Sequence, residues 1–157
     1  MKLKLELIVL PVSDVDRAKE FYEKAGFRLD LAKDITDGYR VVHMTPPDSE
    51  CAIIFGEGLT TAAPGSSQGL YLVVTDIVES RTELVDRGID VSEVFHDAKG
   101  LYFHGHDAGK IVHDVPGQGR EGGPHPDRAS YGSYATFGDP DGNGWVLQEI
   151  TQRFPGR

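Results

Sequence analysis

The spacing of apolar residues changes sharply within the first 26 positions. Residues 5–12 are apolar almost throughout, which predicts a strand buried on both faces. Ser13-Asp14 then provides a helix cap, and apolar side chains follow at spacings of three and four. These are Val15, Ala18, Phe21, Tyr22 and Ala25. Gly26 is the expected end of this helix.

The same pattern returns 62 positions later, since Leu10 corresponds to Leu72. At this offset Val12, Asp14 and Gly26 correspond to Val74, Asp76 and Gly88. We therefore expect a second strand at 69–74 and a second helix at 76–87. Two copies of one strand–helix–strand unit can enclose a cleft between them, and clefts are where proteins hold small ligands.

Short strands separated by turn-forming residues complete each copy. In the first copy we expect antiparallel strands at 27–32, 39–45 and 51–56. In the second copy we expect strands at 89–95, 131–137 and 145–151. Residues 57–68 are rich in glycine, proline and serine and are interpreted as a linker, and residues 105–130 as a long loop that covers or rims the cleft. The fold class is α+β.

Composition narrows the classes of function. The formal charge of −9 and a pI near 5.0 repel phosphate backbones, so nucleic acid is excluded as a partner, and the charge is compatible with a cationic ligand or simply with solubility. The single Cys51 cannot form an internal disulfide, and neither a signal peptide nor a membrane-spanning stretch is recognisable. We expect one cytoplasmic domain over residues 1–157.

Two stretches carry a family resemblance. One runs from Val12-Ser13-Asp14-Val15 through Phe21-Tyr22 to Ala25-Gly26-Phe27, and the other is the turn region from Phe137 to Asn143. Together they resemble the vicinal oxygen chelate superfamily, the group of glyoxalases, bleomycin resistance proteins and extradiol dioxygenases. The resemblance covers about residues 5–150. It implies two βαβββ modules, 5–56 and 69–151, that form a half-open barrel in a homodimer.

Enzymes of this superfamily hold a divalent metal ion in the cavity of the barrel. The positions that correspond to their ligands are occupied here by Leu7, Ile54, Gly69 and Val146. None of these side chains can bind a metal. We therefore expect neither a metal nor another cofactor at the usual site.

A relocated metal site is an alternative. Four histidines lie close together in the sequence with aspartates between them: His96, His104, His106 and His113. Imidazole suits zinc, iron and nickel, but the spacing matches no known signature, and a glycine-rich segment also accommodates solvated histidines.

Other residues are suited to contact an organic ligand. Aromatic side chains that can line a cleft are Phe55, Tyr71, Tyr102 and Trp145, and polar side chains that can orient a ligand are His43, His96 and Gln148. For each of these residues the alternative to a ligand contact is a place in the hydrophobic core. Tyr71 is the strongest candidate, because strand alternation places it on the same face as Gly69. The acidic turn from Asp139 to Asn143 is interpreted as structural.

The sequence favours a metal-free protein that binds a small organic molecule, aromatic or cationic and antibiotic-like, in the manner of drug-sequestering resistance proteins. Three alternatives remain open. The first is a lyase, isomerase or dioxygenase that uses the relocated metal site. The second is a cofactorless enzyme with a cavity histidine or Glu149 as its base, and the third is a module that regulates or scaffolds a partner.

Overall fold

The computed structural model describes residues 1–36, 38–97, 105–107, 110–112 and 120–156, with the main chain alone at 97, 105–107 and 110–112. The described chain divides into two compact units. The first unit comprises Met1–Ser67 and Asp139–Asn143, and the second comprises Gln68–Gly138 and Gly144–Arg157.

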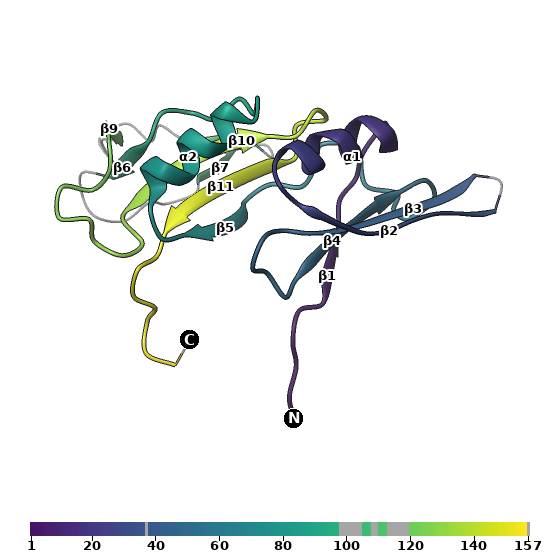
Figure 1. Cartoon of the computed structure of the whole chain (residues 1–157), viewed down its shortest axis with the longest axis horizontal. Coiled ribbons are helices and arrows are strands. Elements are labelled where there is room, and N and C mark those ends of the chain that lie inside the picture. The colour runs from purple at the N-terminus through teal and green to yellow at the C-terminus, as the bar shows by residue number, and fades with distance from the viewer. Residues whose placement is uncertain (37, 98–104, 108–109, 113–119, 157) are drawn as a thin grey trace. The chain divides into compact units, whose positions relative to one another are not determined.

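The first unit contains a four-stranded sheet and one helix (Figure 1). Its elements are β1 (Leu7–Val9), α1 (Val15–Lys24), β2 (Arg28–Thr36), β3 (Tyr39–Thr45) and β4 (Ala52–Gly56). The strand order is β1-β4-β3-β2, with β1 parallel to β4 and the other pairs antiparallel. This arrangement is the predicted βαβββ module.

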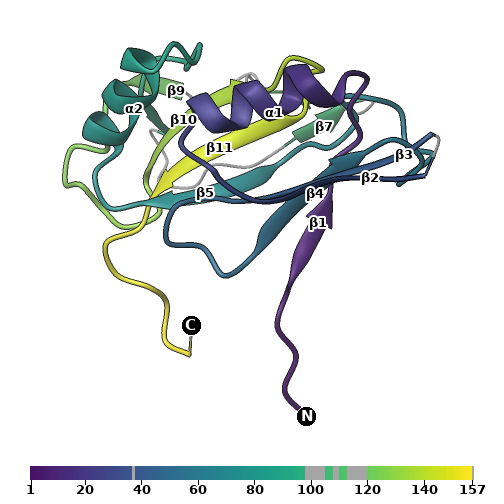
Figure 2. The same cartoon turned by 45° about the vertical axis from the view of Figure 1, so that its right-hand side comes forward.

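The second unit repeats this topology around β5, α2, β6, β10 and β11, and Figure 2 shows β5 and β11 side by side. Its elements are β5 (Leu70–Val74), α2 (Ile77–Asp86), β6 (Phe95–Asp97), β7 (Gly105–Asp107), β8 (Lys110–Val112), β9 (Arg120–Gly122), β10 (Ser133–Gly138) and β11 (Gly144–Glu149). The five-stranded sheet has the order β5-β11-β10-β6-β9, and β7 pairs with β8. Two mixed sheets with few helices confirm the α+β class.

The two helices confirm the 62-residue repeat. Asp14 caps α1 by accepting a hydrogen bond from the Arg17 amide, and Asp76 caps α2 by accepting from the Val78 and Glu79 amides. Shortly after each helix the chain turns at a glycine in the left-handed region, with φ of 92° at Gly26 and 83° at Gly88.

Two predicted segments in the second unit are wrong. The strand expected at 89–95 begins only at Phe95, and within the preceding stretch Val91 forms an isolated bridge to Phe137. The reason lies at Ser92, whose hydroxyl accepts the Thr136 amide proton that a regular ladder would direct to a carbonyl. The expected loop at 105–130 contains β7, β8 and the edge strand β9, because three-residue strands leave little trace in a glycine-rich sequence.

The core of the first unit lies between α1 and one face of its sheet. Tyr22 is fully buried, and its ring centroid lies 5.1 Å from that of Phe27 and 5.7 Å from that of Phe55. Val42 pairs with Phe55 and Met44 with Ile53, so these four side chains share the face that α1 covers. Aromatic packing of this kind provides the largest apolar burial per residue.

The core of the second unit lies on the face that α2 covers. Trp145 pairs with Phe137, and their rings stack with 6.1 Å between centroids. Further along the same face of β11, Glu149 accepts a 2.9 Å hydrogen bond from the Ile77 amide at the start of α2. Among the described residues, no helix is long and apolar enough to cross a membrane.

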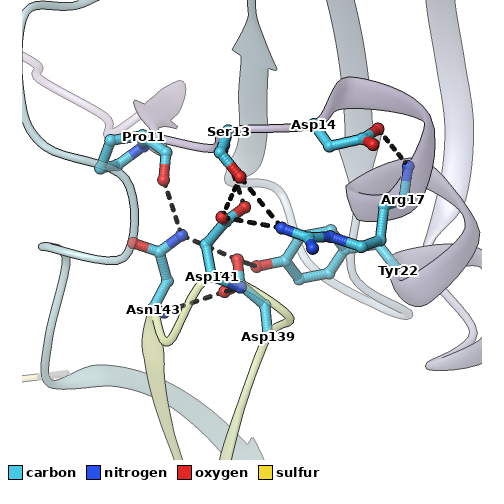
Figure 3. Close-up of polar contacts among 8 residues, drawn as sticks. All are labelled: Pro11, Ser13, Asp14, Arg17, Tyr22, Asp139, Asp141 and Asn143. Carbon is cyan, nitrogen blue, oxygen red and sulfur yellow. Dashed lines mark hydrogen bonds and ion pairs between the residues drawn. The ribbon is translucent and has the colours of Figure 1, made fainter.

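The turn between β10 and β11 belongs to the first unit (Figure 3). The buried Asn143 amide nitrogen donates to the Pro11 carbonyl at 2.9 Å and to the Asp139 carboxylate at 2.7 Å. Asp141 accepts hydrogen bonds from the Ser13 amide and hydroxyl, and its carboxylate pairs with Arg17 at 3.0 Å. These bonds support the structural interpretation of the turn over a catalytic one.

Candidate ligand-binding faces

One face of the first sheet is not covered by α1. On this face, one row of directly paired side chains runs across all four strands. The register pairs Val9 with Ile54, Ile54 with His43, and His43 with Leu31. Because directly paired residues point to the same side of a sheet, these four side chains share one face. We call Val9, Leu31, His43 and Ile54 the first open face.

The first open face is apolar and accessible. Val9 is 42% exposed and Leu31 is 43% exposed, while Ile54 and His43 are half-buried between them. Apolar side chains in a row that no helix covers gain free energy when another apolar surface packs on them, at about 25 cal/mol per Å². His43 is the one polar member of this row.

Asp30, Thr45 and Arg28 form a polar cluster beside the imidazole of His43. Its Nδ1 lies 3.6 Å from Oδ2 of Asp30, which accepts a 2.5 Å hydrogen bond from Thr45 Oγ1. The other carboxylate oxygen of Asp30 accepts a 2.7 Å hydrogen bond from Arg28 Nε. The bond from Thr45, followed by that from Arg28, lowers the pKa of Asp30 below its ordinary value.

A register shift in β2 directs Asp30 to this cluster. Leu29 pairs with Met44 and Leu31 with His43, so Asp30 is an extra residue between two adjacent positions of β3. Such a bulge changes the side to which a side chain points. Asp30 therefore reaches His43 and Thr45, both on the face opposite the one that α1 covers.

The second sheet has a corresponding face on the side opposite Trp145 and Glu149. One row across it pairs Val73 with Gln148 and Gln148 with Tyr134, and the next pairs Tyr71 with Val146. Tyr71 is 40% exposed and Val73 is 45% exposed. We call Tyr71, Val73 and Gln148 the second open face.

Beside the second open face, the side chains at the centre of this sheet are buried. Val146 is fully buried in a cluster with Phe95 and Tyr134. The Arg120 guanidinium lies 3.7 Å from the centroid of the Phe95 ring, close enough for a cation–π contact. The accessible part is thus the edge formed by β5 and the neighbouring Gln148, whose amide donates to the Tyr131 carbonyl at 3.3 Å.

The four positions that correspond to metal ligands in the superfamily provide no ligand atom. Leu7 pairs with Ala52, two residues before Ile54, and Leu7 and Ile54 are both half-buried. Gly69 has no side chain, and Val146 is fully buried. Within the part of the chain that the structure describes, no three His, Cys, Asp or Glu side chains are grouped to hold a metal. These residues do not fit the superfamily's metal ion, because none carries a donor atom.

Three residues proposed as ligand contacts lie elsewhere. Phe55 is fully buried against Tyr22, and Trp145 is 3% exposed against Phe137, so both are core residues of helix-covered faces. His96 is buried, pairs with Ser133, and has its Nδ1 2.9 Å from the Gly123 carbonyl oxygen. The prediction for these three is corrected, because alternation along each strand turns them away from the open faces.

Glu149, the alternative catalytic base, has a structural place. Its carboxylate is fully buried and accepts hydrogen bonds from Arg128 at 2.9 and 2.5 Å and from the Ile77 amide. The bond to Glu149 raises the pKa of Arg128, which also pairs with Asp76 at 3.2 Å. These hydrogen bonds join the start of α2 to β11.

Of the remaining predicted residues, His43, Tyr71 and Gln148 lie on the open faces. Tyr102, His104 and His113 lie outside the described residues, as does the side chain of His106. The sequence interpretation missed Asp30, because alternation along β2 places it opposite Leu31 and only the bulge reverses this. Arg128 was missed because it lay in the expected loop.

The sequence profile of the Glyoxalase/Bleomycin resistance protein/Dioxygenase superfamily matches residues 4–147. Among solved structures, the fold is similar to TnmS3, an antibiotic binding protein from Streptomyces sp. CB03234, with a TM-score of 0.65, 25% identity and coverage of 96% of this chain and 98% of that one. A glyoxalase/bleomycin resistance protein from the same organism has a TM-score of 0.62 and 26% identity, with coverage of 93% and 100%.

A superfamily member from Sphaerobacter thermophilus DSM 20745 shares the fold, with a TM-score of 0.59, 22% identity and coverage of 94% and 98%. A search of curated protein sequences finds no match. The profile match covers most of the chain, and the repeated βαβββ topology agrees with it. The chain belongs to the glyoxalase/bleomycin resistance protein/dioxygenase superfamily.

Proposed function

We propose that this protein binds a small organic molecule, without a metal ion, against an open face of one of its sheets. The observation that carries the proposal is the replacement of the superfamily's metal ligands by Leu7, Ile54, Gly69 and Val146. Without donor atoms at these positions, the chelate chemistry of the enzymes has no support here.

The chemistry of the open faces supports an organic ligand. Val9, Leu31 and Ile54 offer apolar surface, and Tyr71 offers an aromatic ring on which a flat molecule can stack. Small-molecule sites are usually lined by apolar side chains with a small number of polar groups among them. In this proposal burial of apolar area provides the affinity on either face. His43 provides the orientation on the first open face, and Gln148 provides it on the second.

The proposed ligand class is an antibiotic-like molecule with a flat or cationic part. TnmS3, which shares 25% of its residues with this chain, is an antibiotic binding protein. The net charge of −9 favours a cation over an anion at low ionic strength. The protein then acts by sequestering the molecule one to one in the cytoplasm, as drug-binding resistance proteins do.

The proposal includes a homodimer, as the resemblance implies. The strand β2 lies at the edge of its sheet and leaves Leu29 at 39% and Ile35 at 54% exposed, and an edge strand can pair with a strand of another chain. Light scattering during size-exclusion chromatography measures the mass. A mass of two chains supports this part of the proposal, and a mass of one chain at micromolar concentration refutes it.

A thermal-shift series with daunorubicin, a flat cationic antibiotic, and with metal-free bleomycin tests the binding function. A ligand at 100 times its Kd stabilises the folded state by about 2.7 kcal/mol, which is readily detected. Mass spectrometry of the recovered ligand separates binding from catalysis. Stabilisation with unchanged ligand supports sequestration, whereas chemical conversion of the ligand would show an enzyme.

A further inference from the structure

We infer that His43 selects ligands that carry a hydrogen-bond donor, by presenting an Nε2 lone pair beside the apolar side chains of the first open face. The inference rests on the proposed function, because it specifies what the proposed ligand must offer. The class is a flat organic molecule with a hydroxyl or ammonium group on its rim.

The first step is the fixed position of Asp30. Its carboxylate accepts from Thr45 Oγ1 at 2.5 Å and from Arg28 Nε at 2.7 Å, and its side chain is 20% exposed. Hydrogen bonds to a charged acceptor are the stronger ones in proteins. Asp30 is therefore a fixed negative charge beside the imidazole of His43.

The second step is the tautomer of His43. Nδ1 lies 3.6 Å from Asp30 Oδ2, too far for a hydrogen bond but close enough for a strong electrostatic interaction. A lone pair on Nδ1 is repelled by this carboxylate, whereas a proton on Nδ1 is attracted. The neutral imidazole thus carries its proton on Nδ1 and its lone pair on Nε2.

The third step is the surroundings of Nε2. The paired neighbours of His43 across the sheet, Leu31 and Ile54, have no polar side-chain atoms, and among the described residues no hydrogen bond is made to Nε2. The His43 side chain is 26% exposed, so part of the imidazole is accessible from solvent, and the inference takes Nε2 to be in that part. An accessible acceptor between apolar side chains matches an apolar ligand with one donor group.

The geometry also disfavours ligands whose polar group can only accept a hydrogen bond. An acceptor-only group, such as a methyl ether, leaves the Nε2 lone pair without a partner, and covering an unpaired polar group costs free energy. A carboxylate is further disfavoured, because Asp30 adds negative charge to this part of the face. The preference for a donor is therefore a property of His43 and Asp30 together.

Two naphthalenes that differ in one methyl group test the inference. At about pH 8, where imidazole is ordinarily neutral, we expect 2-naphthol to bind the wild-type protein about 3- to 10-fold more tightly than 2-methoxynaphthalene, which is the effect of one hydrogen bond. In His43→Leu this preference disappears while both molecules still bind. Calorimetric titration measures the four affinities.

The tautomer is measured separately. Long-range ¹H–¹⁵N spectra of the imidazole distinguish a proton on Nδ1 from one on Nε2, and we expect the Nδ1–H form in the wild type and a mixture in Asp30→Asn. The control is Asp34→Asn, since Asp34 lies on the same strand and pairs with Arg40 at 3.3 Å rather than with His43. This control keeps the wild-type tautomer.

The outcomes separate the inference from the proposed function. Equal affinity for both naphthalenes, a preference retained in His43→Leu, or an Nε2–H tautomer in the wild type each overturns the inference. If daunorubicin binds but the protein binds 2-naphthol and 2-methoxynaphthalene equally well, the inference fails and the proposed function stands. If neither daunorubicin, bleomycin nor the naphthalenes bind, both fail.

Discussion

The Tyr22 hydroxyl donates a 2.8 Å hydrogen bond to the Asp139 carboxylate, 117 residues away in the sequence. Both groups are buried, and Asp139 also accepts from the amides of Asp141 and Asn143 (Figure 3). The bond links α1 to the turn between β10 and β11, so the turn is held as part of the first unit. Both residues belong to the two stretches that resemble the superfamily in sequence.

Removal of the Tyr22 hydroxyl tests this link. In Tyr22→Phe the ring keeps its packing against Phe27 and Phe55, but the buried Asp139 carboxylate loses one donor. We expect the free energy of unfolding to fall by about 1–3 kcal/mol. Urea unfolding followed by circular dichroism measures it. Tyr39→Phe, at a residue that is 37% exposed, is the control and should change stability by less than about 0.5 kcal/mol.

The place of Glu149 gives a second prediction. Glu149→Gln removes a buried negative charge that accepts from Arg128 and from the Ile77 amide. We expect the free energy of unfolding to fall by about 1.5–3 kcal/mol, because hydrogen bonds to charged groups are among the stronger ones. Ligand affinity should stay unchanged, because Glu149 lies on the helix-covered face. A variant of wild-type stability that has lost ligand binding would contradict this structural role.

Asp30 predicts a pH dependence of stability. Its folded-state pKa is lowered by Thr45 and then by Arg28, so the stabilisation is fully present above the ordinary carboxyl pKa of about 3.9 and is lost as the pH falls through the folded pKa. We expect wild type to be more stable than Asp30→Asn at neutral pH, and the difference to shrink below about pH 4. Urea unfolding at several pH values measures the difference. A difference that stays constant down to low pH would refute the assignment.

The first open face predicts a loss of affinity without a loss of stability. Val9→Gln and Leu31→Gln each replace a residue that is more than 40% exposed. The free energy of unfolding should therefore change by less than about 0.5 kcal/mol. Less apolar contact should weaken daunorubicin binding about 3- to 10-fold, or about 1 kcal/mol. Calorimetric titration measures the affinity. Val85→Gln, at a residue of α2 that is 41% exposed, is the matched control and should bind as the wild type does.

The sequence predicted the repeated framework because its signals are local. Helix caps at Asp14 and Asp76, the following glycines and the alternation along β3 each act within a few residues, and the structure confirms them. Family resemblance added the βαβββ order of each module. The parallel pairing of β1 with β4 was not predicted, because no local pattern specifies it.

The candidate site was predicted only in part, because side-chain direction depends on register. Tyr71 and His43 follow simple alternation and lie on the open faces, whereas Phe55 and Trp145 point into the core under the helices. Asp30 depends on a bulge, which a sequence pattern of alternating residues does not reveal. One shift of register turns every following side chain to the opposite face of the sheet. An error in the predicted register therefore affects all the residues of a strand that follow it.

The central claim is that an organic molecule binds to this chain without a metal ion. Calorimetric titration of daunorubicin into protein purified without an affinity tag, with metal content measured on the same sample, tests it most directly. We expect about one molecule bound per chain, less than about 0.1 metal ion per chain, and the same affinity after treatment with EDTA. About one tightly held zinc, iron, nickel or manganese ion per chain, or binding that EDTA abolishes and the metal restores, would contradict the claim.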